Sequence, residues 1–270
     1  MLVGARPAAS DRAPLGAGFR LEYRVHAGAW TEVWRGVDAQ GRTVAVKLAA
    51  HTVAGGAAVR RLRAEYGLLR RFAHPSIVRP IACVDGPSLV ALVTEYLPGG
   101  DLVSLAGAAP RHWAGAAVAV VEALAALHSK GVVHRDVKAR NVMFDAAGRA
   151  RLIDFGSAAP AGGPRREAGT TPAHRYRDSG MQTTTDDLYA FAVLLYELMA
   201  GRLPVSPESR GGARAPAPPL PARERGRASL EALEALVLQS LTASEAAEIG
   251  SLGAYRDGIE SVLADEWGRP

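Results

Sequence analysis

The sequence predicts an α+β protein of two lobes. The N-terminal lobe would hold an antiparallel sheet and one helix, and the C-terminal lobe mostly helices. Three observations predict this. Residues 19–50 alternate apolar and polar side chains as strands do. The break Leu97-Pro98-Gly99-Gly100 follows, and beyond it apolar residues recur at helical spacing. We therefore expect a flexible lead-in over 1–18, an N-terminal lobe over 19–97 and a C-terminal lobe over 98–270, together forming a single domain.

The N-terminal lobe combines strand patterns with one helical pattern. Alternation over 21–25 and 33–37, a turn at 39–41 and the run 43–48 predict antiparallel strands. The apolar residues that then recur at helical spacing are Val59, Leu62, Tyr66, Leu69 and Phe72. Glu65 falls on their face of the helix. A carboxylate on a buried face is costly unless a cation meets it, so a basic partner is expected.

The remaining elements follow in chain order. Two further strands are predicted over 77–84 and 89–95, before the break. A helix over 113–127 should end near Lys130-Gly131, where glycine favours a C-terminal stop. Residues 187–200 are apolar almost all round, which predicts a helix at the centre of the lobe. The stretch 204–227 is rich in Pro, Gly and Arg and predicts an exposed loop, with helices over 230–241 and 255–264 completing the chain.

Composition excludes several classes of protein. The chain has 270 residues, 48% apolar and 22% charged, which is ordinary for a globular protein. Its single cysteine, Cys83, lies in an apolar run and excludes a disulfide framework or a thiolate metal cage. The net charge is +5, but no aromatic-interleaved basic stripe supports nucleic-acid binding. No run is long enough to span a membrane, and we expect a cytoplasmic protein.

The segment His134-Arg135-Asp136-Val137-Lys138-Ala139-Arg140-Asn141, followed after a short hairpin by Asp154-Phe155-Gly156, carries the chemistry. Two carboxylates and an amide on loops arrive in the order needed to hold a metal–nucleotide and to take a proton from a hydroxyl. At these residues the chain resembles the eukaryotic-like Ser/Thr protein kinase family, of the bacterial type. The resemblance extends over about residues 19–265 and implies a protein-kinase-like fold.

The resemblance implies a role for each residue of this constellation. Asp136 would be the catalytic base, and Lys138 would neutralise the transferring phosphoryl group. Asn141 and Asp154 would supply oxygen ligands to Mg²⁺. Lys47, after Val44-Ala45-Val46, would pair with the phosphates of ATP and be held by Glu65. The alternative is that Lys47 is a strand-end lysine reaching water, that Glu65 is on a solvated face, and that Asp136 and Asn141 only form turns.

Further residues match the family by their position in the sequence rather than by their chemistry. The nucleotide contacts that the resemblance implies are Gly28, Val33, Ala45, Lys47, Glu95, Leu97, Asp101 and Met143. Among these, residues 95–97 would bind adenine and Asp101 the ribose, with Thr94 as the gatekeeper. His134, Phe155 and Leu69 resemble members of the hydrophobic spine. Plain core or loop roles are the alternative for these positions.

Three departures from the family pattern bear on activity. The glycine-rich loop becomes 26–33, and only its middle glycine, Gly28, remains; this predicts weaker nucleotide binding. The family's Ala-Pro-Glu should fall near Arg175-Tyr176-Arg177, and none of the three is kept. Between Ser157 and Thr170 there is no Ser, Thr or Tyr, although Arg135 is of the type that pairs with a loop phosphate.

Three functions remain open. The leading hypothesis is a Ser/Thr protein kinase that uses Mg·ATP, with protein substrates and a regulatory partner protein, and with neither nucleic acid nor membrane. A pseudokinase that serves as a scaffold or nucleotide sensor is the second, favoured faintly by the depleted loop. A small-molecule kinase of the aminoglycoside-phosphotransferase type is the third. Arg135 and Lys138 argue against it, because those enzymes generally have Gly before the catalytic Asp and lack the Lys.

Overall fold

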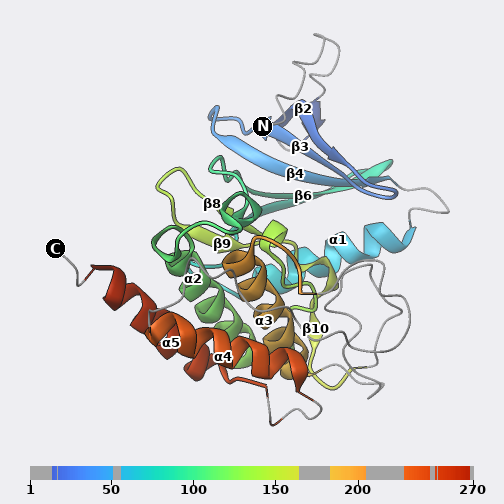
Figure 1. The fold of residues 1–270 in the computed structure, drawn as a ribbon. Helices are drawn as coiled ribbons and strands as arrows, with labels where there is room; N and C mark the ends of the chain where they lie inside the picture. Colours follow the sequence, from blue (N-terminus) through green and yellow to red (C-terminus); the bar gives the residue numbers. More distant parts are fainter. Residues whose placement is uncertain are drawn as a thin grey trace. The chain divides into compact units, whose positions relative to one another are not determined.

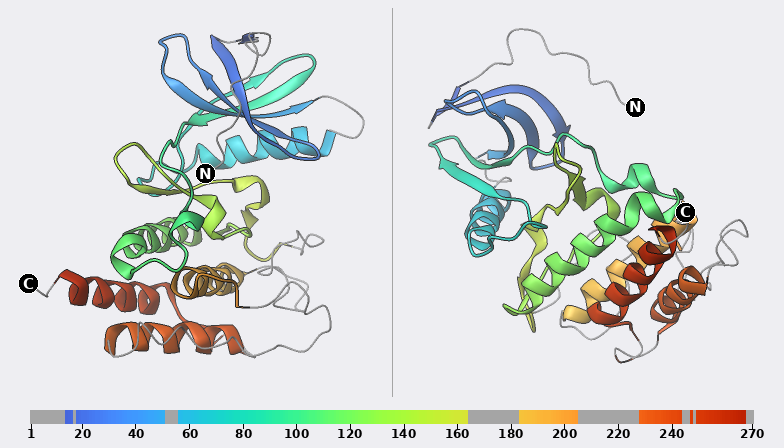
Figure 2. Two further views of the ribbon diagram at one scale, coloured as in Figure 1. Left: turned by 45° about the horizontal axis from the view of Figure 1, so that its top comes forward. Right: turned by 90° about the vertical axis from the view of Figure 1, so that its left-hand side faces the viewer.

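A computed structural model describes residues 14–16, 18–50, 56–163, 183–204, 228–243, 247 and 249–267. The chain divides into two compact units, Met1–Pro98 and Gly99–Pro270 (Figures 1 and 2). An N-terminal antiparallel sheet and a mainly helical C-terminal part confirm the predicted α+β class. Among the described residues, no helix is long and apolar enough to cross a membrane.

Where it is described, the first unit consists of a six-stranded antiparallel sheet and one helix. The strand order is β1-β2-β3-β4-β6-β5. The elements are β1 (Pro14–Gly16), β2 (Phe19–Ala27), β3 (Glu32–Val37), β4 (Thr43–Ala50), α1 (Gly56–Leu69), β5 (Pro80–Asp85) and β6 (Leu89–Glu95). Strand β1 differs from the expected unstructured lead-in, because Pro14 pairs with Arg20 and Gly16 with Phe19.

The two faces of strand β4 have different neighbours. Val44 and Val46 are buried in an apolar cluster with Leu21, Ala91 and Val93. Ala45 and Lys47, which alternate with them along β4, lie on the other face because successive side chains of a strand point to opposite faces. Helix α1 contacts β4, β5 and β6, and Figure 1 shows it lying along the sheet. The alternation therefore places Lys47 on the face opposite the apolar cluster, and its ion pair with Glu65 connects it to α1, the only helix described in this unit.

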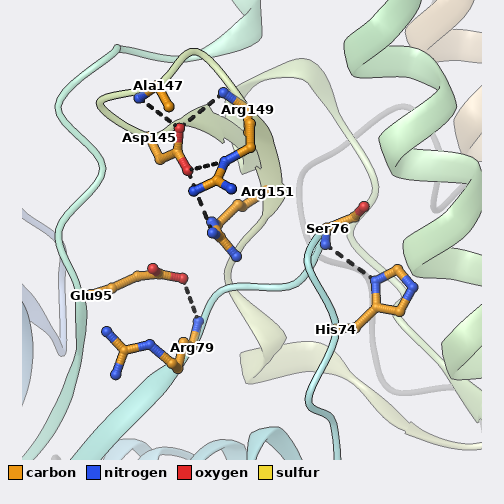
Figure 3. Close-up of polar contacts among 8 residues, drawn as sticks. All are labelled: His74, Ser76, Arg79, Glu95, Asp145, Ala147, Arg149 and Arg151. Carbon is orange, nitrogen blue, oxygen red and sulfur yellow. Dashed lines mark hydrogen bonds and ion pairs between the residues drawn. The ribbon is translucent and has the colours of Figure 1, made fainter.

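Two hairpins use the same five-residue turn, Asp-x-x-Gly-Arg. In the β3–β4 turn, Asp38 Oδ1 accepts the N–H groups of Gln40 and Arg42 at 2.9 Å each. In the β8–β9 turn, Asp145 Oδ1 accepts those of Ala147 and Arg149, also at 2.9 Å (Figure 3). Gly41 and Gly148 have φ of +77° and +76°, which favours glycine. These hydrogen bonds hold the pKa of each aspartate below its usual value, although desolvation opposes them.

The described residues of the second unit include four α-helices. They are α2 (Pro110–His128), α3 (Thr184–Ala200), α4 (Ala228–Thr242) and α5 (Leu252–Trp267). The short elements are η2 (Leu102–Leu105), β7 (Val132–Val133), η3 (Ala139–Asn141), β8 (Val142–Phe144), β9 (Ala150–Leu152), η4 (Phe155–Ser157) and β10 (Ala159–Pro160). Helix α3 contacts α2, α4 and β7, and most of its residues are buried, as the all-round apolar pattern predicts.

A buried hydroxyl joins helices α4 and α5. Ser240 donates to the carbonyl of Leu236 at 2.9 Å. It accepts the phenol O–H of Tyr255 at 2.7 Å and the backbone N–H of Gly250 at 2.9 Å. Burial raises the pKa of Tyr255 to about 12, so the phenol remains a donor at neutral pH. A Cβ on Gly250 would lie 2.9 Å from Leu236 Cδ1, so a larger residue here would displace the end of that side chain.

We expect Ser240→Ala to destabilise the protein more than Tyr255→Phe. Removing the Ser240 hydroxyl leaves two buried donors without their acceptor, at about 1–3 kcal/mol each, whereas the Tyr255 change removes a donor at about 1 kcal/mol. Urea denaturation followed by circular dichroism measures both free energies of unfolding. Equal losses in the two variants would mean that water replaces Ser240 as the acceptor.

Candidate functional site

In the first unit, Lys47 and Glu65 form an ion pair. Lys47 Nζ lies 3.0 Å from Glu65 Oε2. The Glu65 side chain is only 4% exposed and that of Lys47 22%. Burying a carboxylate this deeply is costly without a cation, so the partner expected from helix periodicity is present. A lysine held in this way presents a fixed positive charge at the face of β4.

The turn between β2 and β3 contains Gly28. Its N–H donates to the carbonyl of Thr31 at 2.8 Å, and a Cβ at this position would lie 3.2 Å from the same oxygen. The amide is therefore used within the turn and does not point to a ligand in this conformation. On the same face of the sheet, Val33 pairs with Lys47 in register, and Ala45 lies two residues along β4.

Two apolar side chains, one near the end of β2 and one within this turn, are exposed, and the sequence analysis did not identify them. Val25 is 56% exposed and Trp30 58%. Large apolar side chains that are exposed to water beside a candidate ligand site identify a surface that a ligand could contact. The signal was present in the sequence as an apolar residue near the end of β2 and a tryptophan in a turn.

The last residue of β6 and the two residues that follow it are the expected adenine contacts. Glu95 donates its N–H to the Arg79 carbonyl at 3.0 Å, and its Oε1 accepts the Arg79 N–H at 2.8 Å (Figure 3). The carboxylate of Glu95 is therefore used on Arg79, the residue that precedes β5. Leu97 is 5% exposed. Thr94 pairs with Ala45 in register, next to these residues.

In the second unit, Asp136 accepts hydrogen bonds from two side chains. Lys138 Nζ lies 2.7 Å from Asp136 Oδ2, and Asn141 Nδ2 lies 2.9 Å from the same oxygen. Asn141 Nδ2 also donates to the backbone carbonyl of Asp136 at 2.8 Å. The carboxylate is 14% exposed. Asp136 is thus an oriented acceptor with a cation beside it, which is more than a turn-forming residue needs.

Asn141 and Asp154 are joined through one backbone hydrogen bond. The N–H of Ile153, which precedes Asp154, donates to the Asn141 carbonyl at 2.8 Å. Because Nδ2 of Asn141 is used on Asp136, its Oδ1 is left for another partner. Amide and carboxylate oxygens suit Mg²⁺, which takes few protein ligands and keeps waters and phosphates. The described residues include no group of three or more His, Cys, Asp or Glu side chains that could hold a metal alone.

The ring of His134 is fully buried and its protonation is fixed by its neighbours. Burial lowers the pKa of His134, so the ring is neutral. Nδ1 accepts the Asp136 N–H at 3.3 Å, and Nε2 donates to the Ile153 carbonyl at 3.2 Å. The ring also contacts that of Phe155 edge-on at 4.8 Å. His134 therefore ties the loop that holds Asp136 to the segment that precedes Asp154.

Asp187 organises this loop and was missed as a site residue. It lies in the first turn of α3 with no exposed surface. Its Oδ1 accepts the N–H of Arg135 at 2.8 Å, and its Oδ2 accepts that of His134 at 2.8 Å and lies 2.9 Å from His128 Nε2. Arg135 has φ +71°, a strained conformation for a residue with a side chain. The signal in the sequence was a carboxylate at the start of an otherwise apolar helix.

The remaining site residues lie around the same hairpin. Asp101 forms an antiparallel bridge with Met143 of β8, so two of the expected nucleotide contacts of this unit are adjacent. Arg135 Nη2 lies 3.5 Å from the Pro160 carbonyl of β10. Residues 164–182, which include Thr170, Thr171 and the position expected for Ala-Pro-Glu, are outside the described residues.

Comparisons with known proteins agree with this geometry. The family model described as "Protein kinase domain" matches residues 19–215. Serine/threonine-protein kinase Pkn1 of Myxococcus xanthus is 32% identical over 268 residues, which is 92% of this chain and 38% of that protein. Serine/threonine-protein kinase PkaA of Streptomyces coelicolor is 36% identical over 218 residues, 71% of this chain and 40% of that protein.

The chain spans less than half the length of these curated relatives. The matched region contains all the elements described above that carry candidate site residues, from β2 through α3. The chain belongs to the protein kinase family, as a protein kinase domain.

Proposed function

We propose that this domain transfers the γ-phosphoryl group of Mg·ATP to Ser or Thr hydroxyls of protein substrates. The observation that carries the proposal is Asp136, held by Lys138 and Asn141 through the 2.7 and 2.9 Å contacts at one carboxylate oxygen. Such an acceptor can orient a hydroxyl and take its proton late in the transfer. The similarity to two bacterial kinases named as serine/threonine kinases supports the choice of residue class.

Each side chain has one task in this mechanism. Asp136 accepts the hydrogen bond of the attacking hydroxyl and then its proton. Lys138 exchanges its contact with Asp136 for the charge that develops on the transferring group. Lys47, fixed by Glu65, binds phosphate oxygens of the nucleotide. Asn141 Oδ1 and the Asp154 carboxylate would hold Mg²⁺, which, when bound, offsets phosphate charge. A regulatory partner protein and a cytoplasmic location are parts of the same proposal.

A pseudokinase that binds nucleotide without transfer is the second candidate. It is favoured by Gly28, whose N–H is used on Thr31 and which alone remains of the loop glycines. Against it, the side chains for proton acceptance, phosphate binding and metal binding are all present. A phosphorylation assay with generic protein substrates distinguishes the two, with Asp136→Ala as the control for background. Transfer to aminoglycosides in place of proteins would favour the small-molecule kinase.

Asp154→Asn and Lys47→Met should each abolish phosphoryl transfer. Each variant loses a group that stabilises charge in the transition state, either by holding the metal or by contacting the phosphates. Such a loss raises the barrier by about 3–4 kcal/mol, and each ~1.4 kcal/mol is a factor of ten in rate. The matched control is Asp257→Asn, an exposed aspartate of α5. Circular dichroism establishes that each variant is folded, which matters most for Lys47→Met because Glu65 is buried. If Asp154→Asn kept more than about a tenth of the wild-type rate, Asp154 would not be the principal metal ligand.

Nucleotide binding should depend on Mg²⁺ and be modest, because the turn at Gly28 offers few free amides. Thr31→Gly, which restores a loop glycine, should tighten ATP binding by relaxing that turn. Isothermal titration with ATP, with and without Mg²⁺, measures both effects, and Gly41→Ala in the next turn serves as a control for general loop strain. Tight binding that needs no metal would contradict this account of the loop.

Basal activity should persist without phosphate on the segment that follows β10. The sequence offers no hydroxyl between Ser157 and Thr170, and Arg135 already lies at 3.5 Å from the Pro160 carbonyl. The test is to remove phosphate with a phosphatase, verify its loss by mass spectrometry, and measure transfer. Activity that vanished and returned only with phosphate on Thr171 would show a conventional phosphorylation switch.

A further inference from the structure

In the first unit, one guanidinium, that of Arg35, lies over the rings of two tyrosines near the end of β6. Arg35 Cζ is 5.7 Å from the ring centroid of Tyr23 and 5.6 Å from that of Tyr96. Tyr23 is on β2 and Arg35 on β3, while Tyr96 directly follows β6. Cation–π contact at this distance is attractive. The stack therefore connects the segment between Glu95 and Leu97 to two strands that are distant from it in sequence.

Three further observations show that the position of Arg35 in this stack is fixed by its surroundings. Arg35 Nη2 donates to Thr43 Oγ1 at 3.2 Å, and Nη1 forms an ion pair with Glu22. The Arg35 side chain is only 27% exposed, and partial desolvation strengthens cation–π attraction. Strand β2 has a register shift between Leu21 and Tyr23. Such a bulge re-aims side chains, and here Tyr23 becomes the partner of Arg35 across the ladder.

The two tyrosines also contact each other. Burial raises the pKa of Tyr23, and a hydrogen bond with Tyr96 raises it further, so the phenol is protonated at neutral pH. Tyr96 is thus held by its ring face and by its hydroxyl. Its neighbour Glu95 is held separately, by the paired backbone and side-chain bonds to Arg79. With both residues fixed, the peptide groups between 95 and 97 have little freedom to rotate.

We propose that Arg35 is a positioning residue for base recognition, which acts through Tyr96 to fix the peptide groups of residues 95–97 that select adenine over guanine. The inference rests on the proposed function and on the expectation from the sequence that residues 95–97 bind adenine. Adenine and guanine present opposite donor and acceptor groups at their six-membered ring edge, so discrimination requires peptide groups of fixed direction. A segment free to rotate would accommodate both bases more equally.

The test compares affinity for Mg·ATP with affinity for Mg·GTP by isothermal titration. Arg35→Ala should lower the ratio of ATP to GTP affinity about fivefold, the equivalent of one to two cation–π contacts. It should raise KM for ATP while changing kcat less than about twofold, since the reacting groups are not touched. Arg35→Lys keeps the charge but loses the planar guanidinium. Its ratio of ATP to GTP affinity should therefore lie between those of the wild type and of Arg35→Ala. Tyr96→Phe keeps the ring but loses the hydrogen bond with Tyr23, so it should lower the ratio less than Arg35→Ala does.

The matched control is Arg24→Ala. Arg24 lies over Trp34 at 6.0 Å and pairs with Glu32 at 2.8 Å, so it loses the same kinds of contact on the same sheet without touching Tyr96. Its ATP-to-GTP ratio should be unchanged. Equal weakening of both nucleotides by Arg35→Ala, or the same shift in Arg24→Ala, overturns the inference. If Arg35→Ala does not fold, Tyr96→Leu removes the stack from the other side and should give the same fall. A wild-type protein that binds neither nucleotide would overturn the proposed function itself, which is a separate outcome.

Discussion

The buried carboxylate of Asp187 is the contact on which the geometry of the second unit depends. It accepts two consecutive backbone N–H groups, those of His134 and Arg135, and so holds Arg135 in a left-handed conformation that the residue would otherwise avoid. The position of Asp136, the next residue, therefore depends on this turn. A fully buried charge without these partners would be strongly destabilising, so the loop and the carboxylate stabilise one another.

The other candidate site groups of this unit are connected to this anchor by short hydrogen bonds. The neutral ring of His134 accepts from Asp136 and donates to Ile153, and Ile153 in turn donates to Asn141. The side-chain amide of Asn141 then donates to Asp136, which completes a circuit of hydrogen bonds. The polar groups of this circuit orient one another, so the carboxylate of Asp136 and the amide oxygen of Asn141 keep a fixed direction. On the proposed function, the network orients these side chains before the nucleotide binds, and such preorganisation supplies much of the rate enhancement in phosphoryl transfer.

The first unit uses similar means with different groups. Lys47 is fixed by a buried carboxylate on α1, and residues 95–97 are braced by Arg79 on one side and, as proposed, by Arg35 on the other. The depleted glycine loop is the exception, because the Gly28 amide is used within its own turn. On the proposed function, the binding energy for ATP is thus divided between rigid base recognition and a less adapted phosphate loop. Such a domain would be selective for its nucleotide without binding it tightly.

Much of this protein follows from local sequence. Alternation and helical spacing predicted the α+β class, the sheet of the first unit and the central helix α3, because these patterns reflect burial on one face. The position of Glu65 on an apolar face required a cation, and motif spacing alone pointed to Asp136, Asn141 and Asp154 as candidate site residues. The expected lead-in was wrong at Pro14–Gly16, since pairing with β2 is not visible in three residues.

Only the tertiary structure revealed that Asp187 anchors the loop 52 residues before it and that Arg35 joins Tyr23 to Tyr96. Contacts between residues far apart in sequence leave no local period, because each partner's position depends on how the intervening elements pack. The bulge in β2 that aims Tyr23 at Arg35 is likewise decided by packing, since no residue pattern within the strand specifies it.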